Sequence, residues 1–190
     1  MEKYFRDISS DDEIADVLGN RASILKRCGN LKGALILHKE EERLWSELDN
    51  PFYLSSCLHN QGLIYKALGE YEQALSLYSM YENICRIAGF SQGLAIALDS
   101  KGAILRIQKQ LNEAMKCHYE AERICRDIGD KDGQASAMNQ QALVLKERRK
   151  FDEALILLKQ AEIILRNLGS QDYLQINLSN QGNIQCLKGN

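Results

Sequence analysis

The sequence predicts an all-α protein, specifically a right-handed α-solenoid built from tandem pairs of helices. Three observations support this prediction. Small and apolar residues recur with a period of 40 residues, and such internal repetition is typical of solenoids. The 190 residues include one proline, whereas average usage is about 5%, so long helices can run without interruption. Only 7% of the residues are aromatic, which disfavours a β-sandwich or β-barrel.

The composition excludes several other classes of protein. Apolar residues account for 45% of the chain, which is enough to build a core and excludes disorder. No stretch approaches the roughly 18 apolar residues of a membrane span, and the charged start lacks the apolar region of a signal peptide. We therefore expect a soluble, cytoplasmic protein without a membrane partner. The formal net charge of −2 offers no electrostatic basis for binding nucleic acid.

The 40-residue period divides the chain into an array. We expect a lead-in at 1–10, helix pairs at about 11–49, 50–89, 90–129 and 130–169, and a terminal helix at 170–190. Three positions recur most regularly: a small residue (Ala22, Gly62, Gly102, Ala142, Gly182), a branched aliphatic residue two positions later (Ile24, Ile64, Ile104, Val144, Ile184), and an alanine (Ala34, Ala74, Ala114, Ala154).

The first helix of each pair carries apolar residues at i, i+4 and i+7, as at Leu58, Gly62 and Tyr65, which form one face of an α-helix. This helix is expected to end at a helix-stop position. The position is occupied by Gly29, Gly69, Lys109, Arg149 and Gly189.

The second helix of each pair runs for about eighteen residues and ends in a left-handed cap. It is expected to begin at Leu31, Tyr71, Leu111 and Phe151, and the cap is occupied by Asp49, Gly89, Gly129 and Gly169. The short loops make the two helices antiparallel. Small residues such as Gly62 and Ala74 allow their axes to approach closely. Since one pair cannot bury both of its faces, neighbouring pairs must stack.

At Gly62, Tyr65, Tyr71 and Ala74 the sequence resembles the tetratricopeptide repeat family, and the resemblance covers about 11–190. The 40-residue period is similar to the longer repeats of kinesin light chains, the Leu-Gly-Asn repeat protein and bacterial peptide-sensing regulators. The chain lacks the proline that often ends the second helix. It also replaces the leucine that often precedes the small residue, by Arg21, Gln61, Lys101, Gln141 and Gln181. The resemblance implies that first helices line a concave groove.

Two sets of polar residues recur on the first helices, one on the side that faces away from the partner helix and one at the margin of that side. We name them the amide ladder (Asn20, Asn60, Ser100, Gln140, Asn180) and the basic ladder (Lys26, Lys66, Arg106, Lys146, with Cys186 in the last place). Amides can donate and accept hydrogen bonds along an extended peptide backbone. Basic side chains can hold carboxylates. His59, which lies beside Asn60, is expected to line the same groove.

These ladders favour a non-catalytic protein–protein interaction scaffold that binds an extended, acidic peptide in the concave groove. In the resembled family, asparagines at this place of the first helix hold a peptide backbone. The ladders are also compatible with an ordinary solvated helix face. The alternative function is a structural, regulatory or oligomerisation segment of a larger signalling protein. The chain contains no catalytic motif and no motif for a cofactor.

The cysteines and histidines favour structural roles. The six cysteines show no Cys-x-x-Cys spacing, so we expect reduced thiols and no metal. A site around Cys117, His118 and Cys125 is disfavoured, because adjacent helical residues point about 100° apart. His38 and His118 share one repeat position and are expected at the edge of the core. Glutamates at Glu42, Glu82, Glu122 and Glu162, with Arg86, Arg126 and Arg166 four residues after the last three, are expected to support the second helices.

The terminal helix carries the last prediction from sequence. Leu178, Gly182 and Ile184 are expected to pack back onto the fourth pair. Leu174 and Leu187 are expected on an open face. That face would meet a second copy of the chain or a further repeat of a longer protein.

Overall fold

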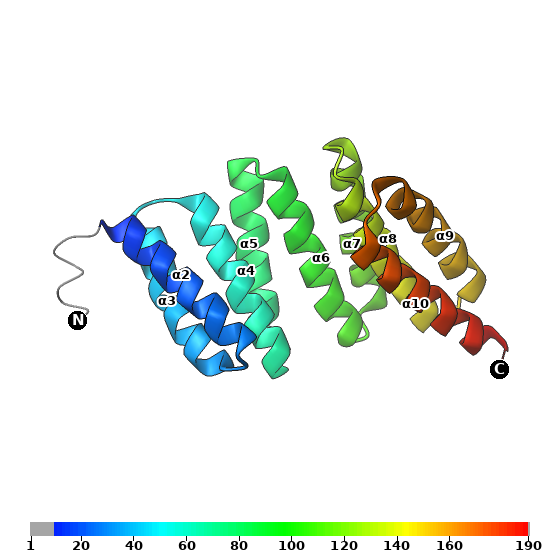
Figure 1. The fold of residues 1–190 in the computed structure, drawn as a ribbon, viewed down its shortest axis with the longest axis horizontal. Coiled ribbons are helices and arrows are strands. Elements are labelled where there is room, and N and C mark those ends of the chain that lie inside the picture. The colour runs from blue at the N-terminus through cyan, green and yellow to red at the C-terminus, as the bar shows by residue number, and fades with distance from the viewer. Residues whose placement is uncertain (1–9, 190) are drawn as a thin grey trace. The chain divides into compact units, whose positions relative to one another are not determined.

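The computed structural model describes residues 10–189, and these residues form α-helices joined by short turns, with no strand among them (Figure 1). The expected lead-in at 1–10 lies outside the described residues except for Ser10, as does Asn190. The helices are α2 (Asp11–Arg27), α3 (Leu31–Glu47), α4 (Pro51–Leu68), α5 (Tyr71–Ala88), α6 (Ser91–Ile107), α7 (Leu111–Asp127), α8 (Lys131–Glu147), α9 (Phe151–Leu168) and α10 (Gln171–Gly189).

The helices fall into two compact units, and each is described by itself. Unit 1 contains α2–α5 and unit 2 contains α6–α10. Within each unit, every helix packs against the next one in the chain. The predicted all-α fold of helix pairs is therefore confirmed.

Residues with a left-handed backbone conformation follow the helices at the predicted positions, and three of these residues are not glycine. Asp49, Lys109 and Arg149 have φ angles of 50°, 63° and 60°, in the region that five glycines occupy elsewhere in the chain. A side chain in this conformation costs roughly 1–2 kcal/mol. The 40-residue spacing identified these positions, although their residue types did not.

The second and third pairs are closed by a contact between the recurring small residue and a large side chain 16 residues later, and in the fourth pair Ala142 packs in one cluster with Leu158. A Cβ atom added at Gly62 would overlap the ring of Tyr78, and one added at Gly102 would lie 2.7 Å from Cε1 of His118. Tyr78 and His118 are fully buried. At Gly62 and Gly102, the absence of a side chain therefore lets the ring of the second helix lie directly on the backbone of the first.

Neighbouring pairs are joined by a polar contact at the position where the family often has leucine. Gln61 Nε2 donates to Glu42 at 2.6 Å. Gln141 and Gln181 donate to Glu122 and Glu162, each at 2.8 Å. Glu122 and Glu162 also accept from an arginine four residues later, as predicted. The glutamates thus stabilise their own helix and bind the next pair.

The two histidines of the core lie deeper than the edge position expected from sequence. His38 and His118 are both completely buried. His38 Nδ1 lies 2.6 Å from Glu41, and His118 Nδ1 lies 2.7 Å from Asp99. Hydrogen bonding to these carboxylates permits the imidazole rings to be buried.

The orientation of α10 differs from the prediction. Leu174, expected on the open face, is 7% exposed and packs with Met138 and Leu165. Leu178, expected to pack inward, is 42% exposed. Gly182 is also exposed, with nothing near its Cβ position, whereas the prediction for Ile184 is correct because it is fully buried. Leu178 belongs to the face that a second helix covers in the four complete pairs, and no described helix covers it on α10.

The small-residue contact can be tested with two matched substitutions. Gly62→Ala should lower the free energy of unfolding by about 1–3 kcal/mol, because the new methyl group must displace the buried ring of Tyr78. Gly182→Ala should raise it by about 0.5–1 kcal/mol, because alanine favours the helix and meets no neighbour. Urea unfolding of both variants measures the difference. Equal effects would show that Gly62 is not a packing residue.

Candidate functional site

In unit 1, four predicted site residues lie together on α2 and α4. Lys26 Nζ donates to Oδ1 of Asn60 at 3.4 Å, which joins the last turn of α2 to the middle of α4. The ring of His59 lies beside Tyr81 and Tyr78, with centroid distances of 5.5 and 6.0 Å. Lys26 and Lys66 both lie close enough to His59 to affect its charge. We name Lys26, His59, Asn60 and Lys66 the unit 1 cluster.

The unit 1 cluster is electropositive and incompletely paired. Burial, together with the smaller effect of the positive charges of Lys26 and Lys66, lowers the pKa of His59 to about 4. Within the described part of the chain, neither lysine forms an ion pair with a carboxylate. His59 Nδ1 and the Tyr78 hydroxyl are buried without a hydrogen-bond partner there. The cluster can therefore accept an anionic group without displacing an internal carboxylate.

Asn20, the first member of the amide ladder, does not join this cluster. Asn20 is exposed on α2, and among the described residues no hydrogen bond connects its side chain to Asn60 or Lys26. The structure thus brings together two lysines, one histidine and one asparagine in unit 1.

In unit 2, an acidic residue pairs with a member of the basic ladder. Arg106 donates to Oε1 of Glu147 at 2.8 Å, and Lys109 donates to Oε2 at 2.8 Å. Although burial alone would raise the pKa of Glu147, the hydrogen bonds from Lys109 and Arg106 hold it below its usual value. Arg106 is therefore already paired with a carboxylate, unlike the lysines of unit 1.

The other predicted residues of unit 2 remain accessible. Ser100, Gln140, Lys146 and Asn180 are half-buried. No ion pair engages Lys146 among the described residues, and Gln140 Oε1 is buried without a partner there. These side chains lie on α6, α8 and α10, so each of the three first helices of unit 2 presents one amide or hydroxyl.

Glu147 was missed because it follows the basic ladder by one position. It comes 41 residues after Arg106. The two side chains meet because they lie at nearly the same position on α6 and α8, the first helices of successive pairs. The equivalent positions hold Arg27, Ala67, Ile107 and Leu187. A search for oppositely charged residues about one repeat apart would have found this pair.

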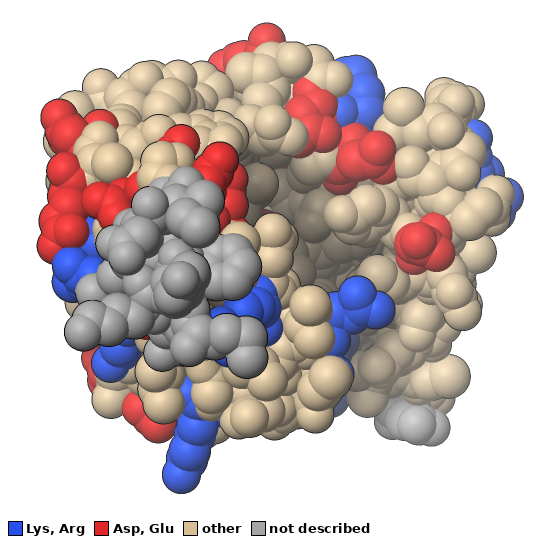
Figure 2. Space-filling model, turned by 60° about the vertical axis from the view of Figure 1, so that its left-hand side comes forward, with Lys and Arg blue, Asp and Glu red and all other residues tan. Residues whose placement is uncertain are grey.

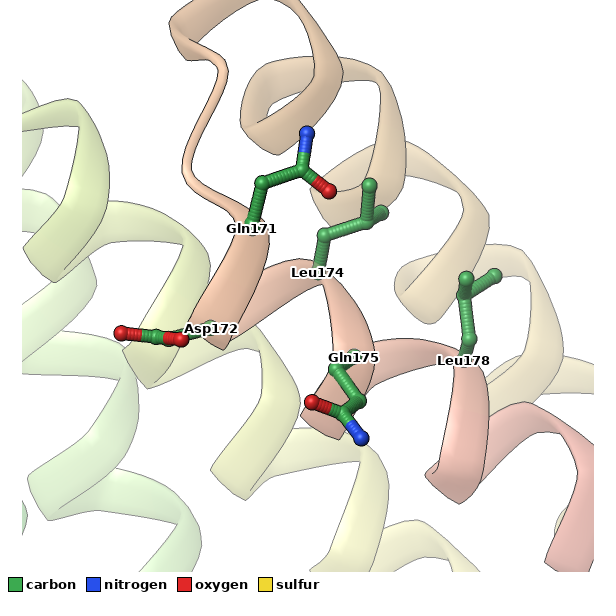
Figure 3. Close-up of a pocket in the computed structure, with 5 residues that line it drawn as sticks. All are labelled: Gln171, Asp172, Leu174, Gln175 and Leu178. Carbon is green, nitrogen blue, oxygen red and sulfur yellow. The ribbon is translucent and has the colours of Figure 1, made fainter.

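A shallow depression lies at the start of α10. It is lined by Gln171, Asp172, Leu174, Gln175 and Leu178. Figure 3 shows Leu174 and Leu178 pointing to one side of α10, whereas Asp172 and Gln175 point elsewhere. The depression therefore combines apolar and polar side chains, and it shares Leu178 with the open face of α10.

Charges of both signs lie on the face of the protein shown in Figure 2. In this view most acidic side chains lie over the upper half and most lysine and arginine side chains lie over the lower half and the right edge, with uncharged residues between them. In the described part of the chain, no helix has both the length and the apolar character that crossing a membrane requires.

The repeats match the family model for Tetratricopeptide repeat over residues 13–87 and 93–167. The chain therefore belongs to the tetratricopeptide repeat family, whose fold generally serves protein–protein interaction. No curated protein sequence matches the chain.

Solved structures share the fold at low sequence identity. BtubC (BKLC) from P. vanneervenii is 18% identical with a TM-score of 0.78, covering 88% of this chain and 70% of that one. Aspartyl phosphate phosphatase F from Bacillus subtilis is 14% identical with a TM-score of 0.88, covering 96% of this chain and 48% of that one, so the present chain spans about half its length. A putative kinesin light chain from Podosopora anserina, with nearly identical TPR-like repeats, is 15% identical with a TM-score of 0.70, covering 96% and 93%.

The low pKa of His59 predicts a dependence of stability on pH. The unfolded chain binds a proton at this residue near pH 6.5, whereas the folded chain resists protonation down to about pH 4. The contribution of His59 to stability is therefore complete above pH 6.5 and is lost as the pH falls towards 4, by at most about 1.4 kcal/mol per pH unit. His59→Phe should lose less stability than the wild type between pH 7 and pH 5 in urea unfolding. Identical losses would contradict the burial of an uncharged imidazole.

Proposed function

We propose that the chain is a non-catalytic scaffold that binds an extended, acidic peptide along the exposed faces of its first helices. The observation that carries the proposal is the unit 1 cluster, where Lys26 and Lys66 flank Asn60 and His59 without an internal carboxylate partner among the described residues. A peptide carboxylate placed there would gain two positive neighbours.

Several weak contacts must act together in this proposal. An exposed ion pair contributes only about 0.2–1 kcal/mol, so two lysines alone would give weak binding. The amide ladder adds groups that donate to and accept from the peptide backbone. Asn20 and Asn60 offer these groups in unit 1, and Ser100, Gln140 and Asn180 offer them in unit 2.

The basic residues contribute unequally in the proposal. Lys26, Lys66 and Lys146 would bind carboxylates directly. Arg106 would first have to leave Glu147, which is held by two hydrogen bonds. Arg106 is therefore assigned a smaller role in binding than Lys66.

A peptide library tests the proposal with a known probe. Random peptides with free C-termini would be selected on the wild-type protein, and individual peptides measured by fluorescence anisotropy. Selected peptides should be rich in Asp and Glu. Their affinity should fall with rising salt, because dissolved ions screen the attraction between exposed charges, over a distance of about 10 Å at 0.1 M. The variant Asn60→Ala/Lys66→Ala should bind them at least tenfold more weakly.

A matched control uses the same residue types on second helices of unit 1. Lys39→Ala/Asn83→Ala removes one exposed lysine and one exposed asparagine from α3 and α5, and it should leave the affinity unchanged. Equal binding by the wild type and the Asn60→Ala/Lys66→Ala variant would contradict the proposal. An affinity that does not change with salt would show that the basic ladder does not contribute to binding, so that only the amide ladder would be kept as a binding surface.

The open face of α10 favours a second candidate function, a structural or oligomerisation segment. Leu178 and Leu187 are 42% and 44% exposed, and Gly182 lies between them without a covering side chain among the described residues. Burying each leucine would contribute about 1.5–3 kcal/mol. We propose that this face meets a second copy of the chain or a further repeat.

The double variant Leu178→Lys/Leu187→Lys tests this candidate. It should abolish concentration-dependent association in sedimentation velocity or, where association is absent, improve solubility. The control Ile156→Lys changes a still more exposed apolar residue on α9 and should have neither effect. A wild-type monomer at all concentrations, with solubility and stability unchanged in the double variant, would contradict the candidate.

A further inference from the structure

Three side chains capable of ligating a metal meet inside unit 1. His38 and Glu41 lie on α3, and Cys57 lies on α4, the first helix of the next pair. Their ligand atoms all lie within 4.8 Å of one another. Within the part of the chain that the structure describes, no other group of three histidine, cysteine or acidic residues comes so close.

The three side chains are enclosed by protein. His38 and Cys57 have no exposed surface, and Glu41 is 9% exposed. His38 Nδ1 lies 2.6 Å from Oε2 of Glu41, and the Cys57 thiol donates to the backbone carbonyl of His38 at 2.9 Å. Gly19 leaves room for the carboxylate, since a Cβ atom there would lie 2.5 Å from Oε1 of Glu41.

The fold itself does not require these three residues. At equivalent positions in the other repeats, the place of Glu41 is taken by Tyr81, Ala121 or Ala161, and most of these side chains are apolar and buried. The place of Cys57 is taken in unit 2 by Ala97, Ala137 and Asn177, and the buried Asn177 amide donates to the carbonyl of Leu158 as the Cys57 thiol does to that of His38. The buried Glu41 carboxylate is paired with His38, which offsets part of the cost of its burial. Cys57 adds a third group capable of ligating a metal beside this pair, and the equivalent positions of the other repeats do not repeat the combination.

We propose that His38, Glu41 and Cys57 form a binding site for Zn²⁺. Imidazole nitrogen, carboxylate oxygen and thiolate sulfur are the three ligand types that Zn²⁺ accepts in proteins, at distances of about 2.0–2.3 Å. Tetrahedral ligands at those distances lie about 3.3–3.8 Å apart, which small side-chain shifts within the observed cluster achieve. A water molecule reaching the exposed edge of Glu41 completes the fourth position.

The charges and protons balance in this site. On binding, the Cys57 thiol loses its proton to solvent and the sulfur forms a bond to zinc. The ring hydrogen of His38 moves to Nε2, which has no hydrogen-bond partner among the described residues, and Nδ1 then binds zinc. One thiolate and one carboxylate neutralise the two positive charges, so the buried site carries no net charge.

Zinc at this place would connect α3 to α4, and thus the first repeat to the second. Binding to the folded state alone raises its apparent stability. The site would therefore regulate or secure the repeat junction that lies beside the unit 1 cluster on α4, without itself contacting a peptide.

Cobalt(II) absorption and thermal unfolding test the proposal. Both use the full chain carrying Cys28→Ser and Cys186→Ser, because these two exposed thiols would bind metal nonspecifically. Added Co²⁺ should produce a thiolate charge-transfer band that equimolar Zn²⁺ removes, and Zn²⁺ should raise the melting temperature of the chain.

The substitutions copy residues that other repeats carry, so the variants should fold. Cys57→Ala should abolish the charge-transfer band, and Glu41→Ala should weaken zinc binding at least tenfold. The control Cys85→Ala removes another buried thiol of unit 1 and should leave the band and the zinc affinity unchanged. A band that persists in Cys57→Ala, or a melting temperature that Zn²⁺ does not raise in the background protein, would overturn the proposal.

Discussion

The close contact between a small residue of the first helix and a large side chain of the second, seen most clearly in the second and third pairs, is the constraint on which the rest of the structure depends. In the second and third pairs, the side chains of Tyr78 and His118 lie against the backbone at Gly62 and Gly102. This contact decides which face of the first helix is buried. The opposite face is left to polar residues, and the amide and basic ladders lie there.

The contacts between pairs serve a different purpose, because they are polar and directional. Gln61, Gln141 and Gln181 each reach a glutamate on the preceding helix. Leucine at this position would stabilise the stack by burial, whereas an amide that must meet one carboxylate also specifies the register of neighbouring helices. A buried amide without that partner would be costly, so misaligned pairs are disfavoured.

The regular parts of this structure could be predicted from sequence because equivalent positions make similar contacts in successive repeats. The helix boundaries, the left-handed residues Asp49, Lys109 and Arg149, and the burial of Ile184 all follow from the period. The rest depends on contacts particular to one repeat. Glu147 pairs with Arg106 across one period. Leu174 packs inward against Met138 and Leu165, whereas Leu178 is exposed because α10 lacks a covering helix among the described residues.

The central claim is that the exposed faces of the first helices bind peptide. It is tested most directly by NMR, following backbone amide shifts of the isotope-labelled chain as an acidic peptide is added. The account predicts that the largest changes lie on α2 and α4 around Lys26, Asn60 and Lys66, with smaller ones on α8 near Lys146. Changes concentrated on the outer faces of α3, α5, α7 and α9 would contradict it.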